Sequence, residues 1–156
     1  MPVKILFVCS GNTCRSPMAQ ALARRMLEEM PGAPEVEVAS AGIAAGNGGP
    51  SANAVEAMAE MGIDISGHRQ RGLSRSDVQS AGLILTMTDS HKNYVLNLYP
   101  WAAGKVFTLG EYAGEETAVE DPFLQPLEAY RRCSQALARL VRRSLDRFLK
   151  ETGAIG

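Results

Sequence analysis

A buried strand that runs directly into a glycine-containing loop and then into a helix is the feature that most constrains this chain. Residues 4–9 are almost continuously apolar, which is typical of a strand buried on both faces of a parallel sheet. The next residues include Gly11, and we expect Ser16 to cap the following helix, with Pro17 at its first position. Apolar residues then recur at steps of three and four, which predicts an amphipathic helix to about residue 30.

The rest of the chain repeats this alternation of strands and helices. We predict strands at residues 36–41, 82–87 and 105–109, and helices at about 52–61, 89–99 and from 127 onward. This order predicts an α/β fold, a four-stranded and mostly parallel sheet with helices on both faces. Ligands in such folds bind beyond the carboxyl ends of the strands. No linker is long enough to separate two domains, so we expect a single domain over residues 1–156.

Two of the predicted helices carry a clear apolar face. In the helix at 52–61, which we expect to stop at Gly62, the inward residues are Ala52, Val55, Met58, Ala59 and Met61. In the last helix they are Leu127, Tyr130, Leu137, Val141, Leu145 and Phe148. Arginines occupy most of the opposite face of this last helix, which we interpret as a solvated surface.

The charge balance of the chain provides no general attraction for a polyanion. Its 156 residues hold 16 Lys and Arg against 17 Asp and Glu, a formal net charge of −1. We therefore expect neither nucleic acid nor a membrane as a partner, and any anion site must be local. The apolar run after Met1 is too short for a secretory or membrane segment. We expect a monomer in the cytoplasm.

The cysteines and histidines point away from disulfides and metal. Three cysteines (Cys9, Cys14 and Cys133) are too few and too odd in number for a disulfide framework. His68 and His91 are the only histidines, and no group of Cys and His has the spacing of metal ligands. We expect no metal and no cofactor, and we interpret His68 as a structural residue.

The run Cys9-Ser10-Gly11-Asn12-Thr13-Cys14-Arg15-Ser16 carries the chemistry. A strand end, a glycine turn and a helix start direct several backbone N–H groups at one point, which makes an anion site. A cysteine at the base of this cup is favoured as thiolate by the helix end, by Arg15 and by a hydrogen bond from Ser16. Arg15 offers a planar fork of donors to phosphate oxygens. These parts indicate a nucleophile, an amide cradle and a clamp for transition-state charge.

The spacing of cysteine and arginine is weak evidence by itself. Cys133 and Arg139 share the six-residue spacing of Cys9 and Arg15. That second match falls inside the last predicted helix, whose amides are already hydrogen-bonded and cannot form a cup. The strand before Cys9 and the helix start after it are what distinguish the first match.

These residues resemble the signature of the low-molecular-weight protein tyrosine phosphatase family. The resemblance rests on residues 8–19, on Ser40-Ala41-Gly42 and on Asp121-Pro122-Phe123, and it spans essentially the whole chain. It implies a four-stranded parallel sheet with flanking helices. It further implies that Cys9 attacks phosphorus and forms a phosphocysteine, and that Asp121 protonates the leaving group and then activates water.

The resemblance also assigns supporting roles in the loop. Asn12 and Ser40 are similar to the pair that braces the loop by hydrogen bonding. Cys14 is similar to the neighbour that forms a reversible disulfide with the nucleophile; a small apolar filler at the helix start is the alternative interpretation. The phosphate would lie against residues 10–16.

Two positions bear on which phosphorylated side chain is hydrolysed. Thr13 and Phe123 resemble the bacterial protein-arginine phosphatase branch of the family, whereas members that act on phosphotyrosine often carry a bulky aliphatic residue at position 13. Thr13 is smaller and polar, and Phe123 would form an apolar wall for a planar group. Residues 43–49 lack the aromatic that the family often has after Gly42. We expect phosphoarginine in proteins as substrate, with phosphotyrosine as the alternative.

Two further hypotheses use the same loop. Thioredoxin-coupled arsenate reductases share the fold, but they need two more cysteines on a downstream segment, and residues 67–87 contain none. A non-catalytic module that binds phosphate or senses oxidants is the second. It would be favoured by loss of Cys9, Arg15 or Asp121, and all three are present.

Overall fold

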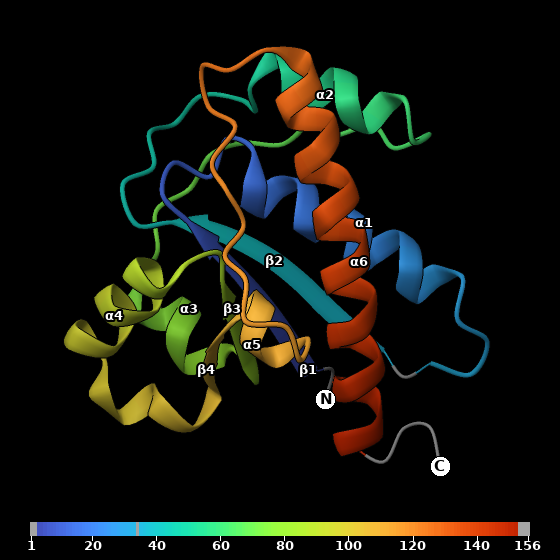
Figure 1. The fold of residues 1–156 in the computed structure, drawn as a ribbon. Coiled ribbons are helices and arrows are strands. Elements are labelled where there is room, and N and C mark those ends of the chain that lie inside the picture. Colours follow the sequence, from blue (N-terminus) through green and yellow to red (C-terminus); the bar gives the residue numbers. More distant parts are fainter. Residues whose placement is uncertain (1–2, 34, 153–156) are drawn as a thin grey trace.

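The computed structural model describes residues 3–33 and 35–152 (Figure 1). Its elements follow the predicted alternation of strands and helices. In chain order they are β1 (Val3–Cys9), α1 (Arg15–Glu28), β2 (Val36–Gly42), α2 (Ala52–Ala59), α3 (Arg75–Ser80), β3 (Leu83–Thr86), α4 (Asp89–Leu98), the 3₁₀ helix η1 (Pro100–Lys105), β4 (Val106–Thr108), α5 (Leu109–Tyr112) and α6 (Leu127–Glu151). None of these described helices is long and apolar enough to cross a membrane.

The four strands form one parallel sheet in the order β2-β1-β3-β4, which confirms the predicted fold class. β1 therefore lies between β2 and β3, and Cys9 at its carboxyl end is paired with Gly42 of β2. A central parallel strand is covered on both faces. This is why residues 5–9 are all buried and why the sequence there is continuously apolar.

The two faces of the sheet are covered by different helices (Figure 1). Ile5, Phe7 and Cys9 of β1 face a core shared with α1, α2, α5 and α6. Leu6 and Val8 face a second core, to which α3, α4 and η1 contribute. Side chains alternate across a strand, so the residue after Cys9 points toward the second layer. This alternation places Ser10 next to α4.

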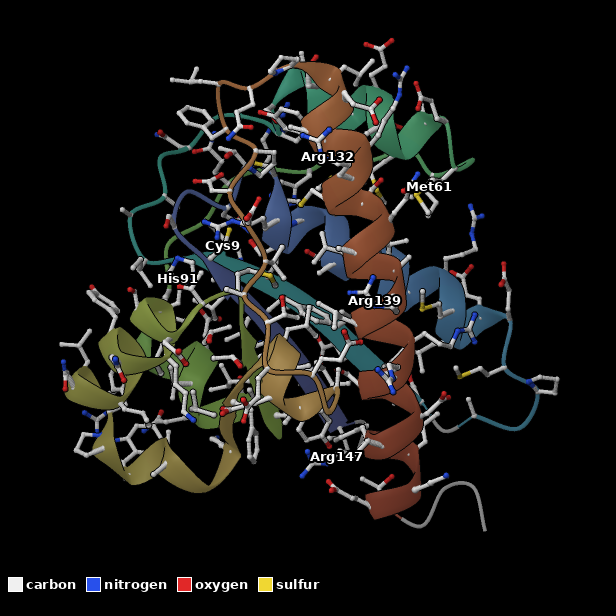
Figure 2. All side chains as sticks on the ribbon, viewed as in Figure 1. Cys9, Met61, His91, Arg132, Arg139 and Arg147 are labelled. Atoms are coloured by element: carbon white, nitrogen blue, oxygen red, sulfur yellow. The ribbon has the colours of Figure 1, made fainter. Side chains whose placement is uncertain are left out.

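The last helix has the predicted faces. Tyr130, Leu137, Val141, Leu145 and Phe148 are buried, while Leu127 at its first turn is only partly buried. The arginine face is largely exposed, as Figure 2 shows for the labelled Arg132, Arg139 and Arg147.

The face predicted for α2 is wrong at several positions. Of the residues expected to point inward, Met58 is buried and Val55 is partly buried, but Ala52, Ala59 and Met61 are exposed. The buried residues of this helix are Ala54, Ala57 and Met58, and the helix packs on α6. Alanine recurs on several sides of this helix, so the apolar pattern of the sequence does not indicate which face is buried. The helix also ends earlier than predicted, at Ala59, and Gly62, with φ of 77°, lies in the turn that follows.

Three short elements were not predicted, namely α3, η1 and α5. Both α3 and α5 begin with a capping box, from Ser74 with Asp77 and from Thr108 with Glu111. A reciprocal cap stabilises the first turn, but helices of four to six residues are too short to show an apolar period. The caps were the only available sequence signal.

The start of α1 also differs from the prediction. The helix begins at Arg15, and Cys14 occupies the N-cap position without a side-chain capping bond. Ser16 therefore lies in the first turn, where its hydroxyl is in contact with Cys9 Sγ at 2.8 Å. The Ser16 hydroxyl therefore contacts Cys9 and does not cap α1.

Candidate active site

The Cys9 loop, residues 9–16, turns at the carboxyl edge of the sheet between β1 and α1 (Figure 2). Cys9 is 2% exposed, and its Sγ lies 2.8 Å from Ser16 Oγ. Asn12 Nδ2 donates to the same Ser16 oxygen at 2.8 Å. Because Ser16 Oγ accepts from the amide, its own proton is available to the sulfur. This arrangement directs a hydroxyl proton toward Cys9 Sγ.

Asn12 is the residue that holds the centre of the loop. It is fully buried and adopts a left-handed conformation with φ of 57°, which asparagine tolerates better than most residues. Its Nδ2 also donates to Ser40 Oγ at 3.0 Å, and its Oδ1 accepts from the Arg71 amide at 3.0 Å. The structure therefore brings together Asn12 and Ser40, as the sequence analysis expected.

The carbonyl groups of the loop are bonded outward. Those of Cys9, Ser10 and Thr13 accept from backbone amides of residues 43, 44 and 51, at 2.9–3.0 Å. A loop whose carbonyls are held on its outer side presents its amides on the inner side, which favours an anion there. These outward bonds agree with the cup predicted at residues 10–16, which stays a prediction.

Arg15 and Asp121 come from opposite ends of the sequence and meet at this loop. Arg15 is 4% exposed; its Nη1 donates to Val119 O at 3.1 Å, and its Nη2 lies 3.5 Å from Asp121 Oδ2. Asp121 lies within residues 117–126, a segment called the acid loop here after the role expected of Asp121, and its side chain is 47% exposed. Its Oδ1 accepts from the Phe123 amide at 3.0 Å. The carboxylate is thus near the guanidinium and open to solvent.

Thr13 and Cys14 lie on the side of the loop that meets Asp121, and Phe123 follows Asp121 in the sequence. Thr13 Oγ1 lies 3.5 Å from Cys14 Sγ, which in turn lies 4.0 Å from Asp121 Oδ1. Cys14 is buried, and burial raises the pKa of its thiol, so this group stays protonated more readily than an exposed one. Phe123 is 52% exposed on the acid loop.

Sequence reasoning missed His91, which contacts the loop from the second layer. Its Nε2 lies 2.8 Å from Ser10 Oγ, and the residue is 3% exposed. Burial first, and then the nearby Arg15 charge, lower the pKa of His91 to about 4. The only sequence signal was Thr88, a helix cap three residues earlier. A cap predicts a helix start, not a contact with a loop 81 residues away.

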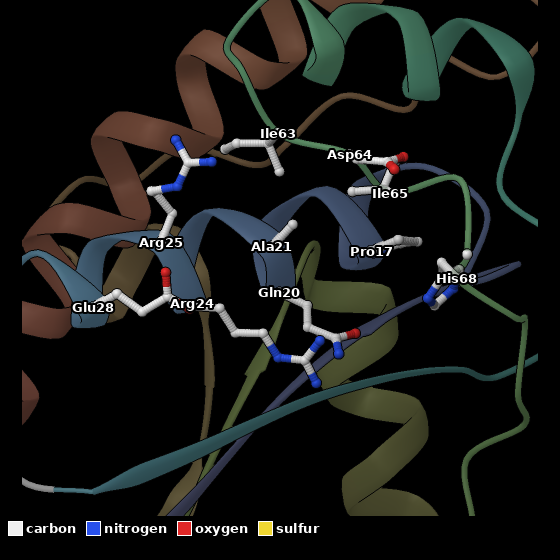
Figure 3. Close-up of a pocket in the computed structure, with 11 residues that line it drawn as sticks. Pro17, Gln20, Ala21, Arg24, Arg25, Glu28, Ile63, Asp64, Ile65 and His68 are labelled. Atoms are coloured by element: carbon white, nitrogen blue, oxygen red, sulfur yellow. The ribbon is translucent and has the colours of Figure 1, made fainter.

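His68 lies on the other side of the loop, near a groove of about 460 Å³ beside α1 (Figure 3). Its Nε2 is 3.0 Å from Asn12 O, and burial lowers the pKa of its ring. The groove is lined by α1 and residues 63–68 and does not include Cys9. The contact with a backbone carbonyl agrees with the structural interpretation of His68.

The second cysteine with an arginine six residues later, Cys133, lies on a helix and not at the start of a loop. Cys133 lies on α6, within regular helix, and burial raises the pKa of its thiol to about 12. Its Sγ is 4.0 Å from Glu120 O. Within residues 3–33 and 35–152, no group of three or more His, Cys, Asp or Glu side chains is arranged to hold a metal ion.

At the carboxyl end of β1 the structure brings together a buried thiol, a guanidinium and a half-exposed carboxylate, which are the groups that a cysteine-dependent phosphatase needs. The comparison with protein families agrees. Residues 4–153 match the family described as low molecular weight phosphotyrosine protein phosphatase, and the chain belongs to it.

Several relatives are similar over nearly their whole length. A protein-arginine-phosphatase of Geobacillus stearothermophilus is 39% identical, covering 97% of this chain and 99% of the relative. A protein of Ralstonia nicotianae described as a probable low molecular weight protein-tyrosine-phosphatase, EpsP, is 43% identical and covers 97% of each chain. The solved structure of the YwlE arginine phosphatase from G. stearothermophilus has a TM-score of 0.88 at 38% identity, covering 99% of this chain and 98% of that one.

Proposed function

We propose that this protein hydrolyses phosphoarginine in proteins through a phosphocysteine formed on Cys9. The observation that carries the phosphatase chemistry is the contact of Cys9 Sγ with Ser16 Oγ at 2.8 Å, in a loop that also contains Arg15. Phosphorylated proteins are the substrates, and residues 10–16 hold the phosphate.

In the first step the Cys9 thiolate attacks phosphorus, the P–S bond forms and the bond from phosphorus to the leaving nitrogen breaks. Asp121 protonates that nitrogen, so guanidine leaves as a neutral group. Arg15 binds two phosphoryl oxygens through its planar fork and stabilises their developing charge. The 3.5 Å contact of Arg15 with Asp121 supports these roles, because it brings the clamp and the acid to the same side of the loop.

In the second step water attacks phosphorus and the P–S bond breaks. Asp121, now ionised, takes a proton from this water, and inorganic phosphate and the Cys9 thiolate are released. Asn12 and Ser40 brace the loop through both steps. A similar solved structure, 38% identical with a TM-score of 0.88 over 96% of this chain and 97% of that one, is described as a cysteine-to-serine variant of YwlE arginine phosphatase with a phosphorylated active-site serine.

The preference for phosphoarginine rests on Thr13 and Phe123. The relatives differ in their described substrates, because the 43% identical one is described as a probable tyrosine phosphatase and the 39% identical one as an arginine phosphatase. Overall identity therefore does not decide the substrate. A threonine beside the phosphate leaves room and a hydroxyl for a planar polar group, and an exposed Phe123 offers a flat apolar wall.

Turnover of a phosphoarginine peptide and of its phosphotyrosine counterpart tests the proposal. We expect kcat/KM to favour phosphoarginine, with no turnover of either peptide by Cys9→Ser. Thr13→Ile should move the ratio toward phosphotyrosine by about tenfold or more, since one buried group discriminates by roughly 10–200-fold. A wild-type preference for phosphotyrosine would favour the alternative activity, and absence of turnover of both would favour the non-catalytic module.

We also propose that Cys14 protects Cys9 from irreversible oxidation. The two thiols belong to the same short loop and both are buried, and a disulfide between them would prevent further oxidation of Cys9. Mild peroxide should inactivate the wild-type enzyme, and added thiol should restore most of the activity. In Cys14→Ser the loss should be permanent. Equal recovery of both proteins would leave Cys14 as a small apolar filler at the helix start.

The working form we propose is a monomeric, single phosphatase domain spanning residues 1–156, in the cytoplasm, without metal, cofactor or nucleic acid. The reactive Cys9 supports a reducing compartment. The net charge of −1 supports a partner other than nucleic acid. Sedimentation at micromolar concentration tests the oligomeric state.

A further inference from the structure

A side-chain contact connects the Cys9 loop to α4, and none of the roles proposed above uses it. Ser10, the residue that follows Cys9, points to the second layer of the fold, where its Oγ lies 2.8 Å from His91 Nε2. Figure 2 shows His91 next to the strand end that carries Cys9. The serine is the first residue of the loop after β1, so this contact acts where the cup begins.

The second ring nitrogen of His91 is also engaged. Its Nδ1 lies 3.1 Å from Thr88 Oγ1, and Thr88 is the N-cap of α4, where its hydroxyl accepts from the His91 amide at 3.3 Å. Two partners fix the orientation of the imidazole within the ring plane. A chain Thr88–His91–Ser10 thereby connects a helix terminus, which is rigid, to the first loop residue.

The contact completes the restraint of the Ser10–Gly11 peptide. The Ser10 carbonyl already accepts from the Ala44 amide at 2.9 Å, and Gly11 by itself has the widest backbone freedom of any residue. With the Ser10 side chain also held, the peptide between these residues is fixed from both layers of the fold. Its N–H belongs to the ring of amides that would face a phosphate.

We propose that His91 is a positioning residue that holds Ser10 through the Thr88–His91–Ser10 chain and thereby fixes the first amides of the phosphate cup. This inference rests on the proposed phosphatase function. His91 touches neither the sulfur nor the substrate in this role. It acts through Ser10, in parallel with Asn12, which restrains the loop from the side of β2.

Removal of the contact between Ser10 and His91 should weaken phosphate binding as well as catalysis. We expect His91→Ala and Ser10→Ala each to lower kcat/KM for an aryl phosphate by about 2- to 12-fold, the range for one hydrogen bond. The inhibition constant of inorganic phosphate should rise by a similar factor. The aryl leaving group needs little protonation, so the assay separates the cup from Asp121. Tyr94→Ala, an exposed substitution on α4, is the matched control and should change neither quantity.

A double-mutant cycle decides whether the two residues act together. If His91 acts through Ser10, the double variant Ser10→Ala/His91→Ala should have a kcat/KM within about twofold of that of the more impaired single variant. His91→Gln, whose amide can reach Ser10, should recover a measurable part of the loss. Multiplicative effects in the double variant, or an unchanged phosphate inhibition constant in both single variants, would overturn the inference.

Two measurements distinguish a failure of the role inferred for His91 from a failure of the proposed phosphatase function. Calorimetric binding of inorganic phosphate to Cys9→Ser, with and without Ser10→Ala, reports on the cup even without turnover, and Ser10→Ala should weaken it. Wild-type inactivity on every phosphate ester would contradict the proposed function. An active wild type with unaffected Ser10→Ala binding would contradict the role of His91 only.

Discussion

At the scale of single residues, the cup depends on how closely β2 passes the Cys9 loop. A Cβ built on Gly42 would lie 2.5 Å from Ser10 O, 2.9 Å from Asn12 N and 3.0 Å from Gly11 C. All three atoms are backbone, so none can rotate away. Gly42 is therefore required by this close approach and not by its backbone angles.

Gly42→Ala should displace the loop. We expect kcat/KM to fall by at least about tenfold, because a small misplacement of catalytic groups is costly, and the free energy of unfolding to fall by roughly 1–3 kcal/mol. Activity assays and urea denaturation measure the two effects. Gly67→Ala is the control, because its Cβ would meet nothing within 4 Å. Equal behaviour of the two variants would show that the loop yields at no cost.

Buried His91 and half-buried His68 make stability depend on pH. The pKa of His91 is lowered to about 4 from an ordinary 6.5, and that of His68 is lowered as well. Between pH 6.5 and about 4 the unfolded chain binds more protons than the folded one, so the free energy of unfolding falls as the pH falls. His91 should account for roughly 1–3 kcal/mol of this loss.

His91→Gln removes this titration and should flatten the dependence. Urea denaturation at several values between pH 7 and 4 gives the slope, whatever the absolute stability of the variant. His68→Gln should flatten it by a separate amount. Parallel curves for the wild type and His91→Gln would mean that the pKa of the His91 ring is the same in the folded and the unfolded chain.

At the scale of elements, the glycine-rich loop at residues 43–50 is held by one side chain. Gln70 Oε1 accepts from the Gly46 amide at 3.0 Å, and its Nε2 donates to Gly49 O at 2.9 Å. The Gln70 amide donates to Gly48 O at 2.8 Å. The loop has no aromatic wall, and its first residues bond to the Cys9 loop. A single glutamine therefore orders a segment beside the candidate substrate site.

Gln70→Ala should loosen this loop. We expect faster hydrogen exchange of the amides of residues 46–49, because segments with few restraints open locally. The ratio of kcat/KM values for phosphoarginine and phosphotyrosine peptides should shrink by about threefold as the slot becomes less defined. Gln79→Ala, an exposed glutamine on α3, is the control. Unchanged exchange and an unchanged ratio would show that the backbone bond of Gln70 suffices.

The elements differ in how well their sequence predicts them. The strands and the long helices α1, α4 and α6 follow from apolar runs and helical periods. α3, η1 and α5 are too short for a period to emerge. The face of α2 was wrong because alanine fits equally on both sides of a helix, so its phase is set by contact with α6 and not by its own pattern.

At the scale of the whole molecule, α6 connects distant parts of the chain. It packs on α1, α2 and α5, and Leu137 near its middle is completely buried in the core that includes Cys9. α6 thereby supports the helical layer that includes α1.

Leu137→Ala should lower the free energy of unfolding by about 2–5 kcal/mol, from lost burial and the remaining cavity. Turnover by the folded fraction should stay within about twofold, because the hydrogen bonds described above for the Cys9 loop do not involve α6. Arg139→Ala, exposed and paired with Glu115, should change stability by less than about 1 kcal/mol. A loss of turnover in folded Leu137→Ala would indicate that α6 packing sets the loop geometry directly.

The strands, the long helices and a loop suited to an anion at residues 10–16 could be predicted from the chain, because apolar period, glycine and helix start are local properties of neighbouring residues. Asp121 and Ser40 were indicated by resemblance to a family and not by physical reasoning. That His91 lies against Ser10, and that Gly42 must lack a side chain, can be seen only in the folded molecule. Both depend on the distance between segments far apart in the chain, which parallel strand order and layer packing set together.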